Sequence, residues 1–152
     1  MGRKGFRSET RGVTERASAR VLRVMVADDS ADFRRSLCAF LADVPGVLVV
    51  GEAADADEAV RVAERTNPDV VLLDLVMPRG GGSSAARRIK GASASSRVIL
   101  LSLLGQRELA HASRSAGADG FVCKADIDTR LMDALAVEAC SDSSGGSHAK
   151  GK

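Results

Sequence analysis

Short apolar runs alternate five times with longer Ala-rich amphipathic segments, and this alternation limits the fold more than any other feature of the chain. The apolar runs predict strands at Leu22–Ala27, Val47–Glu52, Val70–Asp74, Val98–Ser102 and Gly120–Cys123. The segments that follow them predict helices at Ala31–Ala42, Asp55–Thr66, Ser83–Lys90, Gln106–Ala116 and Asp128–Ala139. Strands separated by helix-length segments indicate βαβ units. We therefore expect an α/β protein with a doubly wound parallel sheet, in the strand order 2-1-3-4-5.

The composition is compatible with one folded domain of this kind. The chain has 152 residues, of which 45% are hydrophobic, and it contains no Trp or Tyr and four Phe. A core of Val, Leu, Ile and Ala suits buried parallel strands. We expect a disordered basic leader over residues 1–20, the folded domain over residues 21–140 and a disordered tail over residues 141–152.

The cysteines and the charge pattern indicate a cytoplasmic protein. Cys38, Cys123 and Cys140 are odd in number and lack paired metal-ligand spacing, so reduced thiols are expected. No apolar run is long enough for a signal peptide or a membrane span. The leader holds six Lys or Arg against two Glu, without interleaved aromatic residues, and this favours a solvated tail over a surface that binds DNA or a membrane.

Polar side chains stand where the predicted strands end. The first strand is followed by Asp28 and Asp29, the third ends in Asp74, the fourth ends in Ser102, and the fifth is followed by Lys124. In a doubly wound sheet the carboxyl ends of the strands line one edge, and ligands bind there where the strand order reverses. Each residue alone has a common structural explanation as a cap, a turn residue or a solvated side chain. Together they predict a site.

The charges of these residues predict the chemistry. Three carboxylates about 5 Å apart repel one another by roughly 3 kcal/mol per pair at an effective dielectric constant near 20. Lys124 supplies one compensating cation, and Mg²⁺ is the natural second, because it prefers oxygen ligands and keeps water ligands that a phosphate oxygen can replace. The hydroxyl of Ser102 and the ammonium of Lys124 both suit phosphoryl oxygens. The site therefore predicts magnesium-assisted phosphoryl chemistry.

Four stretches resemble the receiver domain of two-component response regulators, which has a flavodoxin-like (βα)5 fold of the chemotaxis-regulator type. They are "VMVADDS", "VVLLDLVMPRGGG", "VILLS" and "GADGFVCKAD", and the resemblance spans about residues 22–139. The spacing between Asp74, Ser102 and Lys124 is also similar to that of the family. The wording "GADGFVCK" resembles most the receivers of helix-turn-helix response regulators, although we expect a single-domain regulator here because no such output domain follows.

The resemblance implies a role for each site residue. Asp74 is the nucleophile that becomes a 4-aspartylphosphate, with a sensor histidine kinase or a phosphotransfer protein as donor. Asp28, Asp29, Asp74 and the backbone carbonyl of Val76 hold Mg²⁺. Lys124 pairs first with Asp74 and then with a phosphoryl oxygen. The protein is then no enzyme beyond its own phosphorylation and dephosphorylation.

The resemblance also implies a conformational switch. Phosphorylation draws Ser102 inward and Phe121 follows, which alters the face formed by Gln106–Ala116, Gly120–Cys123 and Asp128–Ala139, where a downstream effector protein binds. For Phe121, an ordinary half-buried aromatic remains the alternative.

Leu103 departs from the family pattern, which has Ala or Gly after the hydroxyl residue. Beside the pocket, a leucine restricts the entry of a phosphodonor or of water, and apolar Val76 and Leu104 act in the same direction. We therefore expect slow phosphorylation and slow loss of the phosphoryl group. The loop "PRGGGSS" is also unusual, and it predicts a loosely started third helix.

Three other functions are compatible with parts of this pattern, and each lacks support from one feature of the chain. A haloacid-dehalogenase-type phosphatase needs a second Asp two residues after the nucleophile, where this chain has Val76. A nucleotide-binding flavodoxin-like domain needs a Gly-rich loop after the first strand, which is missing. A pseudo-receiver, a scaffold that binds partners without phosphorylation, is opposed by the complete set of acids, hydroxyl and lysine, and only Leu103 favours it.

Overall fold

The computed structural model describes residues 20–136. The expected tail, Cys140, the end of the last predicted helix and all but the final residue of the expected leader lie outside this range. Within it, no helix combines the length and the apolar content needed to cross a membrane.

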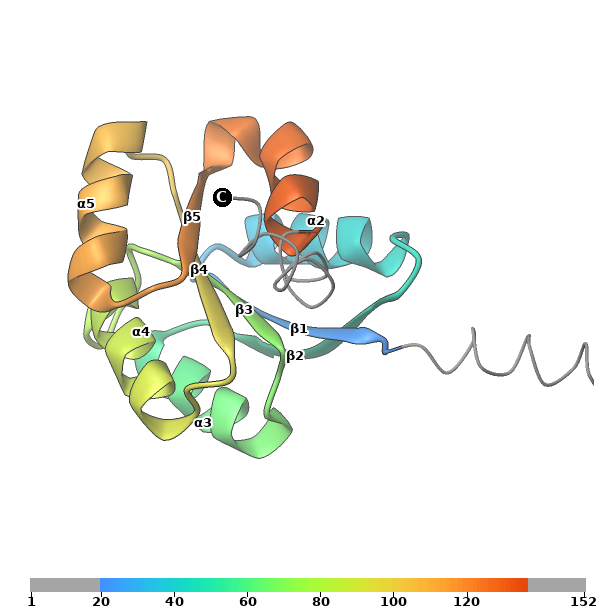
Figure 1. Cartoon of the computed structure of the whole chain (residues 1–152), viewed down its shortest axis with the longest axis horizontal. Helices are drawn as coiled ribbons and strands as arrows, with labels where there is room; N and C mark the ends of the chain where they lie inside the picture. Colours follow the sequence, from blue (N-terminus) through green and yellow to red (C-terminus); the bar gives the residue numbers. More distant parts are fainter. Residues whose placement is uncertain (1–19, 137–152) are drawn as a thin grey trace, which may run out of the picture.

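Five parallel strands form one sheet in the order β2-β1-β3-β4-β5 (Figure 1). They are β1 (Leu22–Ala27), β2 (Val47–Ala53), β3 (Val70–Asp74), β4 (Arg97–Ser102) and β5 (Gly120–Cys123). The strand order reverses between β1 and β3, which lie next to each other at the centre of the sheet. The predicted flavodoxin-like fold is therefore confirmed.

Helices cover both faces of the sheet (Figure 1). They are α2 (Ala31–Ala42), α3 (Ala56–Thr66), α4 (Gly81–Ala92), α5 (Gln106–Ala116), the 3₁₀ turn η1 (Lys124–Asp126) and a C-terminal helix whose described part is residues 127–136. The helices α3, α4 and α5 pack on one face, and α2 and the C-terminal helix pack on the other.

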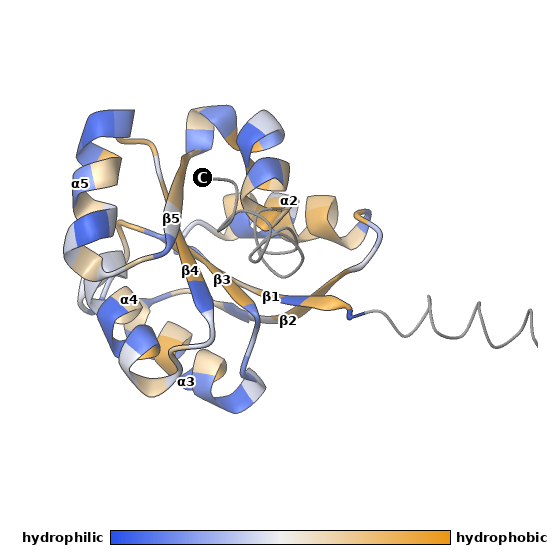
Figure 2. Ribbon diagram, in the orientation of Figure 1, coloured by the Kyte–Doolittle hydropathy of each residue, from blue (hydrophilic) through white to orange (hydrophobic). Residues whose placement is uncertain are grey.

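Side chains that alternate along each central strand fill these two layers. On β1, Met25 belongs to the core under α3, α4 and α5, whereas Val24 and Val26 belong to the core under α2. All five residues of β3 are buried, and Figure 2 shows the central strands as mostly hydrophobic. Burial on both faces explains why these strands are continuous apolar runs in the sequence.

Three predicted helices begin at other residues in the structure, and the C-terminal helix does so one residue early, at Ile127. The α3 helix starts at Ala56, because Asp55 is its N-cap and accepts a hydrogen bond from the Glu58 backbone N–H. The α4 helix starts at Gly81, two residues earlier than predicted, and no side chain caps it. The glycine run allows this start, since Gly80 and Gly81 have φ angles of 112° and 78°.

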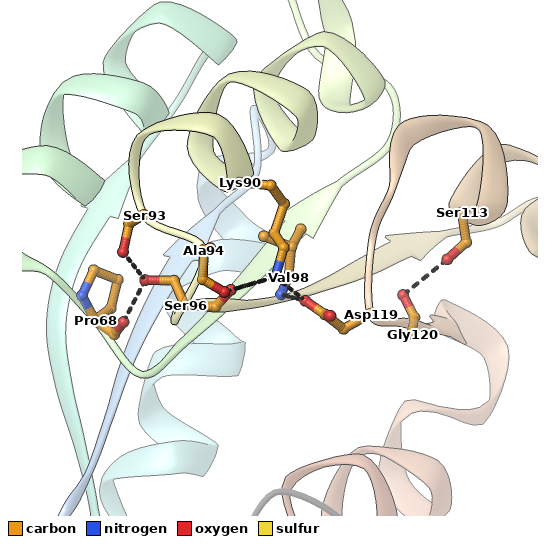
Figure 3. A network of polar contacts seen from close by, with 9 residues as sticks. All are labelled: Pro68, Lys90, Ser93, Ala94, Ser96, Val98, Ser113, Asp119 and Gly120. Atoms are coloured by element: carbon orange, nitrogen blue, oxygen red, sulfur yellow. Dashed lines mark hydrogen bonds and ion pairs between the residues drawn. The ribbon is translucent and has the colours of Figure 1, made fainter.

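A polar network ties together the loops at the amino ends of β4 and β5, at the edge of the sheet opposite to the predicted site (Figure 3). The Lys90 ammonium bonds the Ser96 carbonyl and the Asp119 carboxylate, each at 2.9 Å, and Asp119 also accepts from the Val98 backbone N–H. The buried Ser96 hydroxyl donates to the carbonyl of Pro68 at 2.7 Å. These bonds satisfy buried polar groups and hold the start of each strand in place.

Candidate functional site

The strand register brings the predicted acids together. Ala27 pairs with Leu73, so Asp28, which follows β1, and Asp74, the last residue of β3, lie side by side. Asp29 follows, and one carboxylate oxygen from each of the three acids lies within 4.8 Å of the others. Asp28 and Asp74 are buried, whereas Asp29 is exposed. The edge of the sheet therefore carries three converging carboxylates.

Lys124 lies beside two of these acids. Ser102 pairs with Cys123 at the end of the β4–β5 ladder, so Lys124 emerges just beyond Ser102. Its Nζ atom is 2.7 Å from Asp28 Oδ2 and 3.3 Å from Asp74 Oδ1, and its side chain is only 12% exposed. The pairing with Asp74 was predicted, but the shorter contact with Asp28 was not.

The negative charge of the Asp74 carboxylate is only partly balanced by the positive charge around it. Burial raises its pKa to about 6, and the nearby Asp28 carboxylate adds to the rise. Lys124 and a hydrogen bond from the Val76 backbone N–H act in the opposite direction but do not cancel it. One lysine is thus too little positive charge for three acids.

A divalent cation fits this donor set. The Asp28 Oδ2 atom is fully buried and pairs with the Lys124 ammonium at 2.7 Å, so one cation serves an acid that has no contact with water. The oxygens of Asp28, Asp29 and Asp74 are hard ligands of the kind that Mg²⁺ prefers. The acidic pocket is therefore able to bind a metal ion.

The acids, Ser102 and Lys124 line one open pocket of about 460 Å³. Ser102 is buried, and its Oγ accepts a hydrogen bond of 3.1 Å from the Leu104 backbone N–H. The rim is apolar, because the side chains of Val76, Leu103 and Leu104 are 67%, 81% and 43% exposed. Exposed aliphatic groups thus surround a strongly charged floor.

Phe121 lies apart from this pocket. It is partly buried on β5, where it packs against the core under α3, α4 and α5, and it lines a separate pocket of about 240 Å³ with Gln106 and Arg130. Its predicted role as a switch residue stays a prediction.

Two residues of α2 that the sequence reasoning missed also contact the site. The ring of Phe33 lies under the Lys124 ammonium, 4.2 Å from its centroid. The Arg34 guanidinium donates to the backbone carbonyl of Asp28 at 2.6 Å and to Glu52 at 3.1 Å. Both residues lie in the first turns of α2, whose N-cap Ser30 directly follows the acidic pair. This position in the sequence could have identified them as neighbours of the site.

Gly82 is a third residue that was missed. Its backbone lies directly behind that of Asp74, and a Cβ atom there would overlap the backbone carbonyl oxygen of Asp74 and come within 2.7 Å of Leu75 Cα. The glycine run therefore allows α4 to pack closely behind Asp74, in addition to shaping a turn.

Neither of the two thiols in the described range lines this pocket. Cys38 and Cys123 are free, as predicted. Burial, followed by the neighbouring Glu52 carboxylate, raises the pKa of Cys38 to about 11, so this thiol stays protonated near neutral pH.

Comparison with known proteins gives one consistent family. The model of the response regulator receiver domain matches residues 24–136. The chain is 39% identical over 128 residues to the transcriptional regulatory protein PdtaR of Mycobacterium tuberculosis, covering 82% of this chain and 60% of that protein. It is 42% identical over 98 residues to a protein-glutamate methylesterase/protein-glutamine glutaminase of Geobacter metallireducens, covering 64% of this chain and 28% of that protein. The chain thus spans at most about three fifths of these relatives.

Solved structures agree with this result. A LuxR-family two-component response regulator from Aurantimonas sp. SI85-9A1 has a TM-score of 0.71 and 34% identity, covering 77% of this chain and 84% of that one. The response regulator domain of Thermotoga maritima CheB has a TM-score of 0.68 and 31% identity, covering 79% of this chain and 95% of that one.

Proposed function

We propose, since the chain belongs to the response regulator receiver domain family, that Asp74 accepts a phosphoryl group and that the resulting change of conformation signals to a partner protein. The donor is a sensor histidine kinase or a phosphotransfer protein. One observation carries the proposal: Asp74 lies buried within reach of Lys124, in a pocket where three carboxylates converge.

The side chains of this pocket supply the groups that the proposed reaction needs besides magnesium. A carboxylate oxygen of Asp74 attacks phosphorus, the O–P bond forms, and the P–N bond to the donor histidine breaks. The electron pair of that bond stays on the imidazole nitrogen, which takes up a proton. Lys124 and Ser102 donate hydrogen bonds to the phosphoryl oxygens, so the site acts by positioning and by balancing charge.

Magnesium is part of the proposal. Asp28, Asp29, Asp74 and the Val76 carbonyl would hold it, and the convergence of three carboxylates beside a single lysine supports this assignment. When bound, Mg²⁺ supplies positive charge against the acids and the phosphoryl oxygens. Ser102 and Phe121 remain the proposed switch, and α5, β5 and the C-terminal helix the proposed effector face. We keep the expectation that the chain acts in the cytoplasm without binding DNA directly.

A direct test is phosphorylation of the full chain with Mg²⁺ and either acetyl phosphate or phosphoramidate, followed by intact mass measurement. We expect a gain of one phosphoryl group that Asp74→Asn abolishes and that Asp43→Asn, a change of an exposed acid after α2, leaves intact. No gain from either donor or from any histidine kinase would overturn the proposal. It would favour the phosphorylation-independent scaffold, for which the exposed Leu103 at the rim is the supporting observation.

A further inference from the structure

The Lys124 ammonium has a third partner besides its two carboxylates. It lies over the face of the Phe33 ring, 4.2 Å from the centroid, while its Nζ is 2.7 Å from Asp28 Oδ2 and 3.3 Å from Asp74 Oδ1. The distance to the ring is well within the range of about 6 Å over which an ammonium is attracted to an aromatic face. Lys124 is therefore held by two acids and by a ring on α2.

Hydrogen bonds through Ser30 connect Asp28 to Phe33, so the contacts among these residues and Lys124 form a closed cycle. Asp28 Oδ1 accepts a hydrogen bond of 2.8 Å from the Ser30 backbone N–H. The Ser30 hydroxyl, as N-cap of α2, accepts one of 3.2 Å from the Phe33 backbone N–H. The ring of Phe33 faces Lys124, and Lys124 pairs with Asp28 Oδ2. The acid that pairs with the lysine thus also places the ring beneath it.

An aromatic ring is well suited to this position. A lysine side chain has a flexible four-carbon stem, and two acids at unequal distances alone leave its ammonium free to move between them. A third carboxylate would add charge to a pocket that already has too much, and an aliphatic side chain would not attract the ammonium. A ring face attracts the cation without net charge and leaves its N–H groups available to oxygens.

We infer that Phe33 is a positioning residue of the reaction site, whose ring holds the Lys124 ammonium between Asp28 and Asp74, where an incoming phosphoryl oxygen meets it. The inference rests on the proposed function for its catalytic consequence. Phe33 does not touch the reacting atoms, and it acts through Lys124.

The surroundings of Phe33 allow substitutions that keep the fold. The ring packs against the core under α2 but is only partly buried, and it lines a small pocket of about 110 Å³ together with Leu37, Phe40 and Ile127. Phe40 belongs to the same helix and the same pocket and is 39% exposed, but no ammonium of the described residues lies over its ring. Phe40→Leu is therefore a matched control for Phe33→Leu.

The first experiment measures the phosphorylation rate with phosphoramidate at saturating Mg²⁺. From the strength of partly buried cation–π contacts, we expect Phe33→Leu to slow the reaction about three- to tenfold, and Phe33→Tyr and Phe40→Leu to stay within about twofold of wild type. Pentafluorophenylalanine at position 33 keeps the shape of the ring but reverses its quadrupole, so it should slow the reaction as Leu does without changing the unfolding midpoint. A purely structural role of Phe33 would leave that variant as fast as wild type, and this result would overturn the inference.

A second measurement does not depend on phosphorylation. NMR relaxation of the Lys124 Cε group in the metal-free protein reports how firmly the side chain is held. We expect the order of this group to fall in Phe33→Leu and in the pentafluorophenylalanine protein, and to persist in Phe33→Tyr and Phe40→Leu. If wild type accepts no phosphoryl group, the proposed function fails and this measurement alone decides the inference; unchanged order in the first two variants overturns it.

Discussion

Lys124 lies closer to Asp28 than to Asp74, with its ammonium 2.7 Å from the first carboxylate and 3.3 Å from the second. Asp28 is completely buried, so it depends on this lysine more than a solvated acid would. The ammonium is thus shared, and Asp74 is only partly neutralised. Burial and then the Asp28 carboxylate raise the pKa of Asp74, and the shared lysine lowers it only in part.

Replacement of Asp74 by Asn should stabilise the metal-free protein by about 1–3 kcal/mol near pH 7.5. Burial and then the Asp28 carboxylate raise the pKa of Asp74 from 3.8 to about 6, so its charge costs free energy in the folded state. Between these values the native protein binds the extra proton. The protonated Asp74 therefore stabilises folded wild type fully below pH 3.8, and this stabilisation is lost as pH rises through about 6.

Urea unfolding of wild type and Asp74→Asn at several pH values measures this difference. The advantage of the variant should grow between about pH 4.5 and pH 7.5. A constant or shrinking difference would contradict the raised pKa. Asp43→Asn removes an exposed acid and should show no such trend.

Replacement of Lys124 by Gln should tighten Mg²⁺ binding about three- to tenfold and slow phosphoryl transfer, because the ammonium and the metal ion balance the same carboxylates. Isothermal titration with Mg²⁺ measures the first effect, and the phosphorylation rate measures the second. Arg87→Gln removes one exposed positive charge on α4 and is the control. Weaker Mg²⁺ binding in the lysine variant would show that the two cations do not compete.

Replacement of Leu103 by Ala should shorten the lifetime of the phosphorylated protein and speed its formation. The leucine is 81% exposed and lines the pocket, and we expect its side chain to hinder the approach of water and donor. Decay of the acyl phosphate, followed by intact mass after donor removal, should last many minutes in wild type and several-fold less in the variant. Decay of wild type within seconds would refute a barrier at this position.

Replacement of Gly82 by Ala should destabilise the protein by about 1–3 kcal/mol, since the added Cβ overlaps the backbone behind Asp74. Gly91→Ala lies in the same helix with nothing within 4 Å of its Cβ, and it should be neutral or stabilise by up to about 1 kcal/mol. Thermal unfolding compares the two. Equal effects would mean that α4 does not pack closely behind Asp74.

The sequence alone predicted most of the fold. The bounds of β1, β3, β5, α2 and α5 agree with the structure, because buried parallel strands are continuous apolar runs and because capping residues mark the helix ends. It also predicted that Asp28, Asp29, Asp74, Ser102 and Lys124 meet, since parallel strands end at one edge. Both results follow from patterns local to the chain, combined with a single topology.

The tertiary structure decided which of these groups contact one another. The preference of Lys124 for Asp28, the ring of Phe33 beneath it and the close approach of Gly82 all depend on strand register and on the angle at which each helix leaves its strand. Shifts of about an ångström change such contacts without altering the sequence pattern, because ion pairs and van der Waals contacts weaken over that distance. Local patterns specify where a polar group emerges, and packing between distant segments specifies its partner.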